Sequence, residues 1–121
     1  MKTSIADALA RLPAAPTAQY PEGAPSATVM AHGSMQLKVF SPATNTGGRD
    51  RQLPHDQDEL YLVHAGSATM VIGDQQWPAR AGDAFFVAAG ASHRFDDAST
   101  DFATWVVFYG QIGRASCRER V

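Results

Sequence analysis

Between residues 26 and 110, turn residues interrupt the chain at close spacing and divide it into short apolar runs. Apolar runs of about four to eight residues bounded by Gly, Asp, Asn or Pro are typical of β-strands. The runs cover residues 27–32, 35–40, 59–65, 68–72, 75–78, 84–88, 92–95 and 103–109. About eight strands in this pattern favour an antiparallel sandwich or barrel. A parallel β/α fold would need a helix between strands, and no helical run separates these strands.

The first 25 residues follow a different pattern. Residues 4–12 are predicted to form a short helix, because Ser4 can cap it and Asp7 lies in its first turn. Pro13 ends this helix, and residues 13–25 carry four prolines, which predicts an extended linker over the surface. The expected organisation is therefore an N-terminal helix and linker over residues 1–25 and one barrel domain over residues 26–110.

The last residues, 111–121, differ abruptly in composition from the rest of the chain. Three of the ten basic residues lie there, together with Cys117, the only cysteine. The segment resembles the translation of a common sequencing-adapter oligonucleotide, so we interpret it as a non-native tail; a genuine basic tail is the alternative. A single cysteine allows no internal disulfide bond.

Composition excludes several classes of protein. Hydrophobic residues make up 45% of the chain, which indicates a globular domain, and 121 residues are enough for one core. The net charge of −2 without a basic cluster argues against nucleic-acid binding. No apolar run approaches the roughly 18–20 residues of a membrane span. Asp7 and Arg11 interrupt any apolar core of a signal peptide, so we expect a cytoplasmic protein.

Several strands are apolar on both faces, although a small barrel needs an apolar inner face only. Tyr61 and Val63 alternate with Leu60 and Leu62 along one such strand. The second face must be covered by the N-terminal segment or by another subunit. We predict a homodimer that packs through sheet faces.

Two clusters contain residues suited to chemistry. On an extended strand His55, Gln57 and Glu59 would point the same way, and the histidine and the carboxylate could supply adjacent ligands to one ion. Taken alone, a histidine near an acid is more often a surface ion pair. His93 follows a Gly82-Asp83 turn and an apolar strand, and taken alone it could equally be a core histidine.

Together the two clusters resemble the two sequence motifs of the cupin superfamily. The second cupin motif is glycine, five residues, proline, one residue, glycine, two residues, histidine, three residues and asparagine. The chain keeps this spacing through Gly82, Gly90 and His93. Ala88 stands in place of the proline and Asp97 in place of the asparagine.

The first cupin motif ends in a glutamate, six residues and a glycine, which Glu59 and Gly66 match. His55 occupies the place of the second histidine of the family's His-any-His arrangement. Leu53 occupies the place of the first histidine and cannot bind a metal. The resemblance therefore implies three metal ligands, His55, Glu59 and His93, with Gln57 as an additional ligand or a neighbour of the ligands.

The resemblance also implies a fold and a set of functions. The fold would be an all-β double-stranded β-helix, a jelly-roll barrel, with a short N-terminal helix. One divalent iron, manganese, nickel, zinc, cobalt or copper ion would lie inside it. The expected function is a metal-dependent, dioxygenase-like oxidoreductase acting on a small organic molecule, with no catalytic residue assigned. A non-catalytic small-molecule binding or sensing module is the first alternative, and an isomerase or epimerase is the second.

The aromatic residues expected at the pocket wall are Tyr61, Phe86, Phe95 and Trp105.

Overall fold

The computed structural model describes residues 1–44 and 48–110, and these residues form two facing antiparallel sheets. The strands are β1 (Ser26–His32), β2 (Met35–Phe40), β3 (Asp58–Ala65), β4 (Ser67–Ile72), β5 (Gln75–Arg80), β6 (Ala84–Val87), β7 (His93–Asp96) and β8 (Ala103–Tyr109). They lie within a residue or two of the predicted runs. Two short helices, α1 (Ile5–Leu9) and the 3-10 turn η1 (Pro42–Thr44), complete the described elements.

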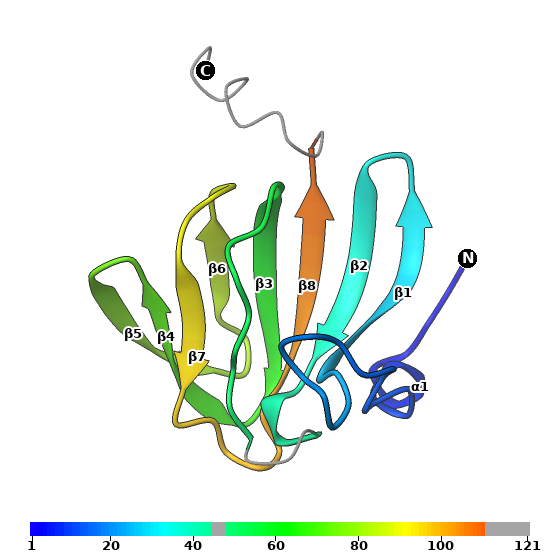
Figure 1. Ribbon diagram of the computed structural model, residues 1–121, viewed down its shortest axis with the longest axis horizontal. Coiled ribbons are helices and arrows are strands. Elements are labelled where there is room, and N and C mark those ends of the chain that lie inside the picture. The colour runs from blue at the N-terminus through cyan, green and yellow to red at the C-terminus, as the bar shows by residue number, and fades with distance from the viewer. Residues whose placement is uncertain (45–47, 111–121) are drawn as a thin grey trace.

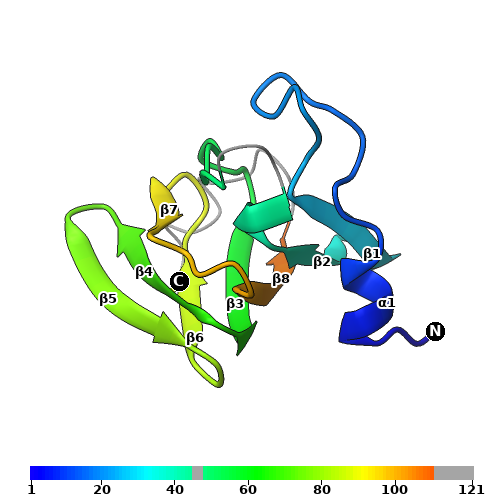
Figure 2. The ribbon, with the colours of Figure 1, turned by 90° about the horizontal axis from the view of Figure 1, so that it is seen from below.

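The larger sheet has five strands in the order β1-β2-β8-β3-β6, and the smaller has three in the order β5-β4-β7. Neighbouring strands in both sheets are antiparallel. Figure 1 shows the central strands β3, β8 and β2 of the larger sheet running nearly upright, and Figure 2 shows the two sheets facing each other across the barrel interior. The prediction of an all-β jelly-roll barrel with one short N-terminal helix is confirmed.

The core lies between the two sheets and follows the alternation of their side chains. Along β3, Glu59, Tyr61 and Val63 are buried, whereas Leu60 and Leu62 are exposed. Large apolar side chains from the other strands, and that of Phe102 just before β8, close the core. They include Phe40, Met70, Phe95, Phe102, Val106 and Phe108.

Gly66 connects the larger sheet to the smaller sheet, because it lies between the end of β3 and the start of β4. Its φ of +77° lies in the left-handed region, where residues other than glycine are strained. A Cβ atom at this position would lie 2.6 Å from the backbone nitrogen and Cα of Phe102. The glycine of the first motif therefore has a steric role, which is to let two backbone segments pass in contact.

The N-terminal segment packs beside the larger sheet (Figure 2). Ser4 caps α1 as predicted, since its hydroxyl accepts a hydrogen bond from the Asp7 backbone nitrogen at 3.1 Å. The helix ends at Leu9, earlier than predicted, and turns lead into Pro13, which has no N–H to continue a helical ladder. The following segment is anchored at Tyr20, a buried residue.

Within the described residues, no helix is long and apolar enough to cross a membrane. The predicted non-native tail, residues 111–121, lies outside the described residues.

Candidate metal centre

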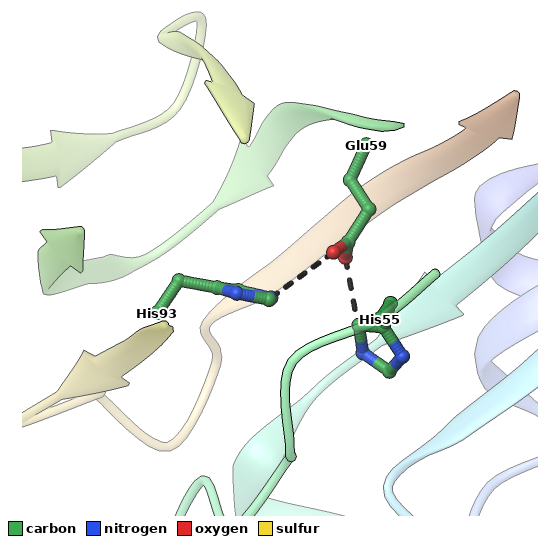
Figure 3. A group of neighbouring side chains, drawn as sticks. All are labelled: His55, Glu59 and His93. Atoms are coloured by element: carbon green, nitrogen blue, oxygen red, sulfur yellow. Dashed lines mark ion pairs between the residues drawn. The ribbon is translucent and has the colours of Figure 1, made fainter. Parts of the chain in front are cut away.

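His55, Glu59 and His93 come together inside the barrel from three separate segments (Figure 3). His55 precedes β3, Glu59 points inward from β3, and His93 begins β7 on the opposite sheet. The Nε2 atom of His93 lies 3.3 Å from one carboxylate oxygen of Glu59, and Nε2 of His55 lies 4.0 Å from the other. One ligand atom from each residue lies within 4.8 Å of the other two. This spacing suits three ligands around one ion.

The ring orientation of His93 is set by its own turn. Its Nδ1 lies 2.9 Å from the Ala91 carbonyl oxygen, and because a carbonyl can only accept, Nδ1 carries the hydrogen. The neutral ring then presents the Nε2 lone pair to the centre of the site. A backbone carbonyl that fixes the tautomer in this way is the usual partner of a metal-binding histidine.

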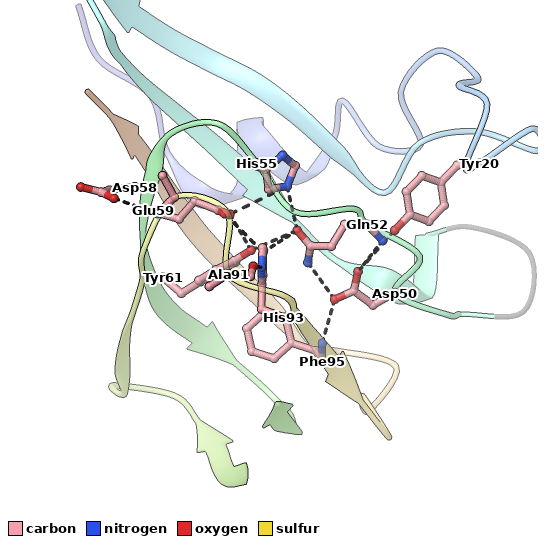
Figure 4. Close-up of polar contacts among 11 residues, drawn as sticks. Tyr20, Asp50, Gln52, His55, Asp58, Glu59, Tyr61, Ala91, His93 and Phe95 are labelled. Atoms are coloured by element: carbon pink, nitrogen blue, oxygen red, sulfur yellow. Dashed lines mark hydrogen bonds and ion pairs between the residues drawn. The ribbon is translucent and has the colours of Figure 1, made fainter. Parts of the chain in front are cut away.

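Gln52 is a fourth residue of the site, and no motif or periodicity in the sequence predicts it. Its side-chain oxygen, Oε1, lies 3.1 Å from Nε2 of His55 and 3.1 Å from Nε2 of His93 (Figure 4). Its amide nitrogen donates to Oδ2 of Asp50 at 2.8 Å, which fixes which end of the amide faces the histidines. The site therefore has an amide oxygen beside its carboxylate and two imidazoles.

Asp50 holds Gln52 in place from the side away from the histidines. Its carboxylate accepts hydrogen bonds from the backbone nitrogens of Phe95, at 2.7 Å, and Gln52, at 3.2 Å. Burial raises the pKa of Asp50, and these hydrogen bonds oppose that effect. The Tyr20 hydroxyl donates to Asp50 at 3.4 Å, so the N-terminal segment contacts this support (Figure 4).

Tyr61 supplies one proton to the site. Its hydroxyl lies 2.9 Å from Oε1 of Glu59 and 3.2 Å from Oε1 of Gln52. Burial and the charge of Glu59 raise the pKa of Tyr61 well above its usual value, so the hydroxyl stays protonated. A single hydroxyl hydrogen can satisfy only one of the two oxygens at a time.

The centre of the site has more acceptors than donors. The Glu59 carboxylate, Oε1 of Gln52 and Nε2 of His93 all turn lone pairs toward the same space. Burial lowers the pKa of His55 more than the charge of Glu59 raises it, so the His55 ring is neutral near pH 7. Buried acceptors that face one another are unfavourable unless a cation or a proton lies between them. The donor set therefore fits a divalent metal ion.

A proton is the competing occupant. Burial lowers the pKa of His93, but the hydrogen bond to Glu59 and its charge outweigh burial and raise this pKa overall. A metal must displace that proton to bind, because a ligating imidazole is neutral. The same geometry thus serves a metal or an imidazolium–carboxylate pair.

The structure places Gln57 away from this centre. Its amide nitrogen donates to the backbone oxygens of Ser34, at 2.9 Å, and Gly110, at 2.7 Å. Gln57 would align with Glu59 only on a strand that is extended from residue 55, but β3 begins at Asp58. Gln57 instead joins the turn after β1 to the end of β8.

Of the four aromatic residues predicted at the pocket wall, the structure brings Tyr61 to it. Phe95 lies in the core, 2% exposed. Phe86 and Trp105 are not brought to the pocket: they lie on the outer face of the larger sheet, paired with Leu60 and Leu62. Both faces of these strands are apolar, so the sequence alone does not show which aromatic side chains point into the barrel.

A cavity of about 300 Å³ opens beside the site. Gln52, His55 and Tyr61 form its inner wall, so it leads to the candidate metal ligands from one side. Its other walls come from the N-terminal segment, β1, β2, β8 and the segment before β3: Thr17, Gln19, Tyr20, Ala24, Ser26, Lys38, Phe40, Leu53, Pro54, Val106 and Phe108.

Known proteins resemble the chain in sequence and in fold. An uncharacterised protein of Streptomyces coelicolor is 38% identical over 72 residues, which are 60% of this chain and 69% of that protein. A cupin superfamily protein from Desulfitobacterium hafniense has a TM-score of 0.56 at 21% identity, covering 71% of this chain and 76% of the other. KdgF from a Halomonas species has a TM-score of 0.58 at 16% identity, covering 69% and 76%.

The two structural similarities are too distant in sequence to indicate more than a shared fold. A family model for the cupin domain matches residues 41–109, a span that contains both motifs, all four donors of the site and most of the barrel. The chain therefore belongs to the cupin family.

Proposed function

We propose that the protein binds one divalent transition metal ion through His55, Glu59, His93 and Gln52. The observation that supports this proposal is the convergence of two imidazole nitrogens, a carboxylate and an amide oxygen on one buried space. Iron, manganese, nickel, zinc, cobalt and copper all accept this mixed nitrogen and oxygen donor set. One carboxylate among neutral donors leaves net positive charge on a divalent ion, which favours an anionic ligand.

We propose further that the bound metal supports oxidoreductase chemistry of the dioxygenase type on a small organic molecule. Two histidines and one carboxylate form the ligand set of non-haem iron oxygenases. When bound, the metal would supply a Lewis acid and a template for substrate and oxygen. The Tyr61 hydroxyl would donate a hydrogen bond to Oε1 of Glu59 and so weaken the donation of electron density from this carboxylate to the metal.

The exposure of the candidate metal ligands supports entry of a small molecule from the cavity. The side chains of Glu59 and His93 are 1% and 0% exposed, whereas that of His55 is 33% exposed. A ligand would therefore meet the site on the His55 side, and the opposite side would keep water out.

Elemental analysis of protein purified without a metal-affinity column tests the proposal. We expect about one transition metal per chain, and loss of that metal in His93→Ala. His64→Ala is the matched control, because His64 is exposed on β3, the strand that also carries Glu59, and its loss should leave the metal content unchanged. Metal-free protein that takes up no metal on titration would refute the proposal.

Gln52→Ala tests the fourth donor separately. We expect metal affinity to fall about 10- to 100-fold, measured by competition with a chelating dye, while the fold is kept. Unchanged affinity would remove Gln52 from the ligand set. Oxygen-consumption assays of the metal-loaded protein with diketones, thiols and phenols then separate an enzyme from a binding module.

We also propose a homodimer, formed through the outer face of the larger sheet. Leu60 and Leu62 are 39% and 41% exposed there, Phe86 is 62% exposed and Tyr109 is 58% exposed. Leu60 pairs with Phe86 on one side and Val107 on the other, so these side chains form a continuous row across three strands. A row of this kind on a flat face suits a twofold contact with a second copy.

A further inference from the structure

Lys38 places a positive charge in the cavity that leads to the candidate metal centre. It points inward from β2, where it pairs with Val106 of β8, and it lines the cavity together with His55. Among the residues that line this cavity, Lys38 is the one that carries a full charge at neutral pH. The cavity is therefore electropositive at its wall.

The surroundings of Lys38 do not neutralise this charge. Its Nζ atom lies 4.6 Å from the centroid of the Phe108 ring, a cation–π contact. Within the described residues, no carboxylate forms an ion pair with Lys38. Burial lowers the pKa of Lys38, and the charge of Glu59 only partly opposes this effect. A half-buried ammonium without a counter-ion gains more from an anionic ligand than a solvated one.

Lys38 and His55, a residue of the candidate metal centre, both contact one aromatic ring, that of Phe108. The imidazole of His55 meets Phe108 edge-on, with 5.0 Å between ring centroids. Lys38 contacts the same ring with its ammonium group. Because Lys38, His55 and Phe108 line the same cavity, a small molecule packed against Phe108 would lie within reach of both the ammonium and His55.

We propose that the cavity binds a small organic acid, with its carboxylate on Nζ of Lys38 and its apolar body against Phe108 and Val106. The volume of about 300 Å³ is at the lower end of the range for small-molecule sites, which favours a compact acid. Assigning this acid as the substrate rests on the proposed function; the binding site for the acid does not.

Benzoate is a suitable probe, with benzamide as its uncharged analogue of nearly equal shape. We expect isothermal titration calorimetry to show that benzoate binds at least about tenfold more tightly than benzamide. Lys38→Met should remove this preference, so that both probes bind with similar weak affinity. Circular dichroism and a cooperative unfolding transition would show that the variant is folded.

Arg94→Met is the matched control. It also removes one positive charge, but Arg94 is exposed on β7, where it pairs with Asp96 at 2.9 Å outside the cavity. This variant should keep the preference for benzoate. Equal loss in both variants would mean a general charge effect and would overturn the inference, as would the absence of benzoate binding up to about 10 mM.

The titrations are made on chelator-treated protein and again after metal is added. Preference for benzoate that depends on Lys38 in metal-free protein supports the acid site even if no metal binds. A protein that binds metal but shows no Lys38-dependent preference refutes the acid site and leaves the metal proposal standing. The two failures are therefore distinguishable.

Discussion

At the scale of single residues, the buried polar groups of this protein are arranged for a ligand rather than for stability. Tyr61, Gln52 and Glu59 turn oxygen atoms toward one another where apolar side chains would pack more favourably. Lys38 adds a half-buried charge that no carboxylate of the described residues pairs. Such groups make the unliganded state less stable than it could be.

Lys38→Met should therefore stabilise the unliganded protein at pH 7, raising its melting temperature by a few degrees. The pKa of Lys38 in the folded state lies below its ordinary value of 10.5, mainly because of burial. The folded state thus binds the lysine proton less tightly than the unfolded state, which destabilises the protein while Lys38 is charged. The advantage of the variant should shrink as pH rises from the lowered pKa toward 10.5.

Melting curves of both proteins between neutral pH and about pH 10.5 check this expectation. Arg94→Met, which removes an exposed charge, should show little change across the same range. A Lys38→Met variant that is less stable at pH 7 would mean that the cation–π contact with Phe108 outweighs the burial of the charge.

At the scale of elements, the connection at Gly66 determines whether β3 and β4 can pass from one sheet to the other. Gly66→Ala should lower the free energy of unfolding by more than about 2 kcal/mol, because it adds a backbone clash to a left-handed conformation. Gly73→Ala is the control: its φ is +58°, but a Cβ there meets nothing within 4 Å. It should cost only about 1 kcal/mol.

Urea denaturation of the two alanine variants measures the difference. Both variants lose stability because of the positive φ. The additional loss of unfolding free energy in Gly66→Ala therefore measures the clash with the Phe102 backbone. Equal destabilisation of the two variants would contradict the steric role of Gly66.

The strands could be predicted from sequence because their turn residues and two-residue alternation are local signals. The approach of His55, Glu59 and His93 could be predicted because the two motifs anchor each residue beside a strand. Gln52 could not, because residue 52 lies in a coil without periodicity. Its orientation depends on Asp50, which a long-range hydrogen bond from the Phe95 backbone holds.

At the scale of the whole molecule, the outer face of the larger sheet remains apolar after folding. If two copies pair through it, Phe86→Lys should convert a dimer to a monomer in light scattering coupled to size-exclusion chromatography. A charge buried in an apolar interface is left without a partner there, which is costly. Phe86 is more exposed than any other aromatic residue on this face, so the substitution should leave the fold intact.

Trp77→Lys is the control for this experiment. Trp77 is also a partly exposed aromatic residue, 39% exposed, but it lies on β5 of the smaller sheet. This variant should keep the mass of the unaltered protein. A monomeric unaltered protein at micromolar concentration would refute the dimer.

The hydrogen bonds around Asp50 connect two parts of the protein that the sequence treats as separate. Tyr20, in the N-terminal segment, donates to the carboxylate that also orients Gln52. If Gln52 binds a metal ion as proposed, docking of residues 13–25 and binding of the ion become linked equilibria. The ion would then strengthen the attachment of that segment by the same factor by which the segment strengthens binding of the ion. The proline-rich segment, residues 13–25, therefore supports the site from the same chain in the way that a second subunit supports a site at an interface.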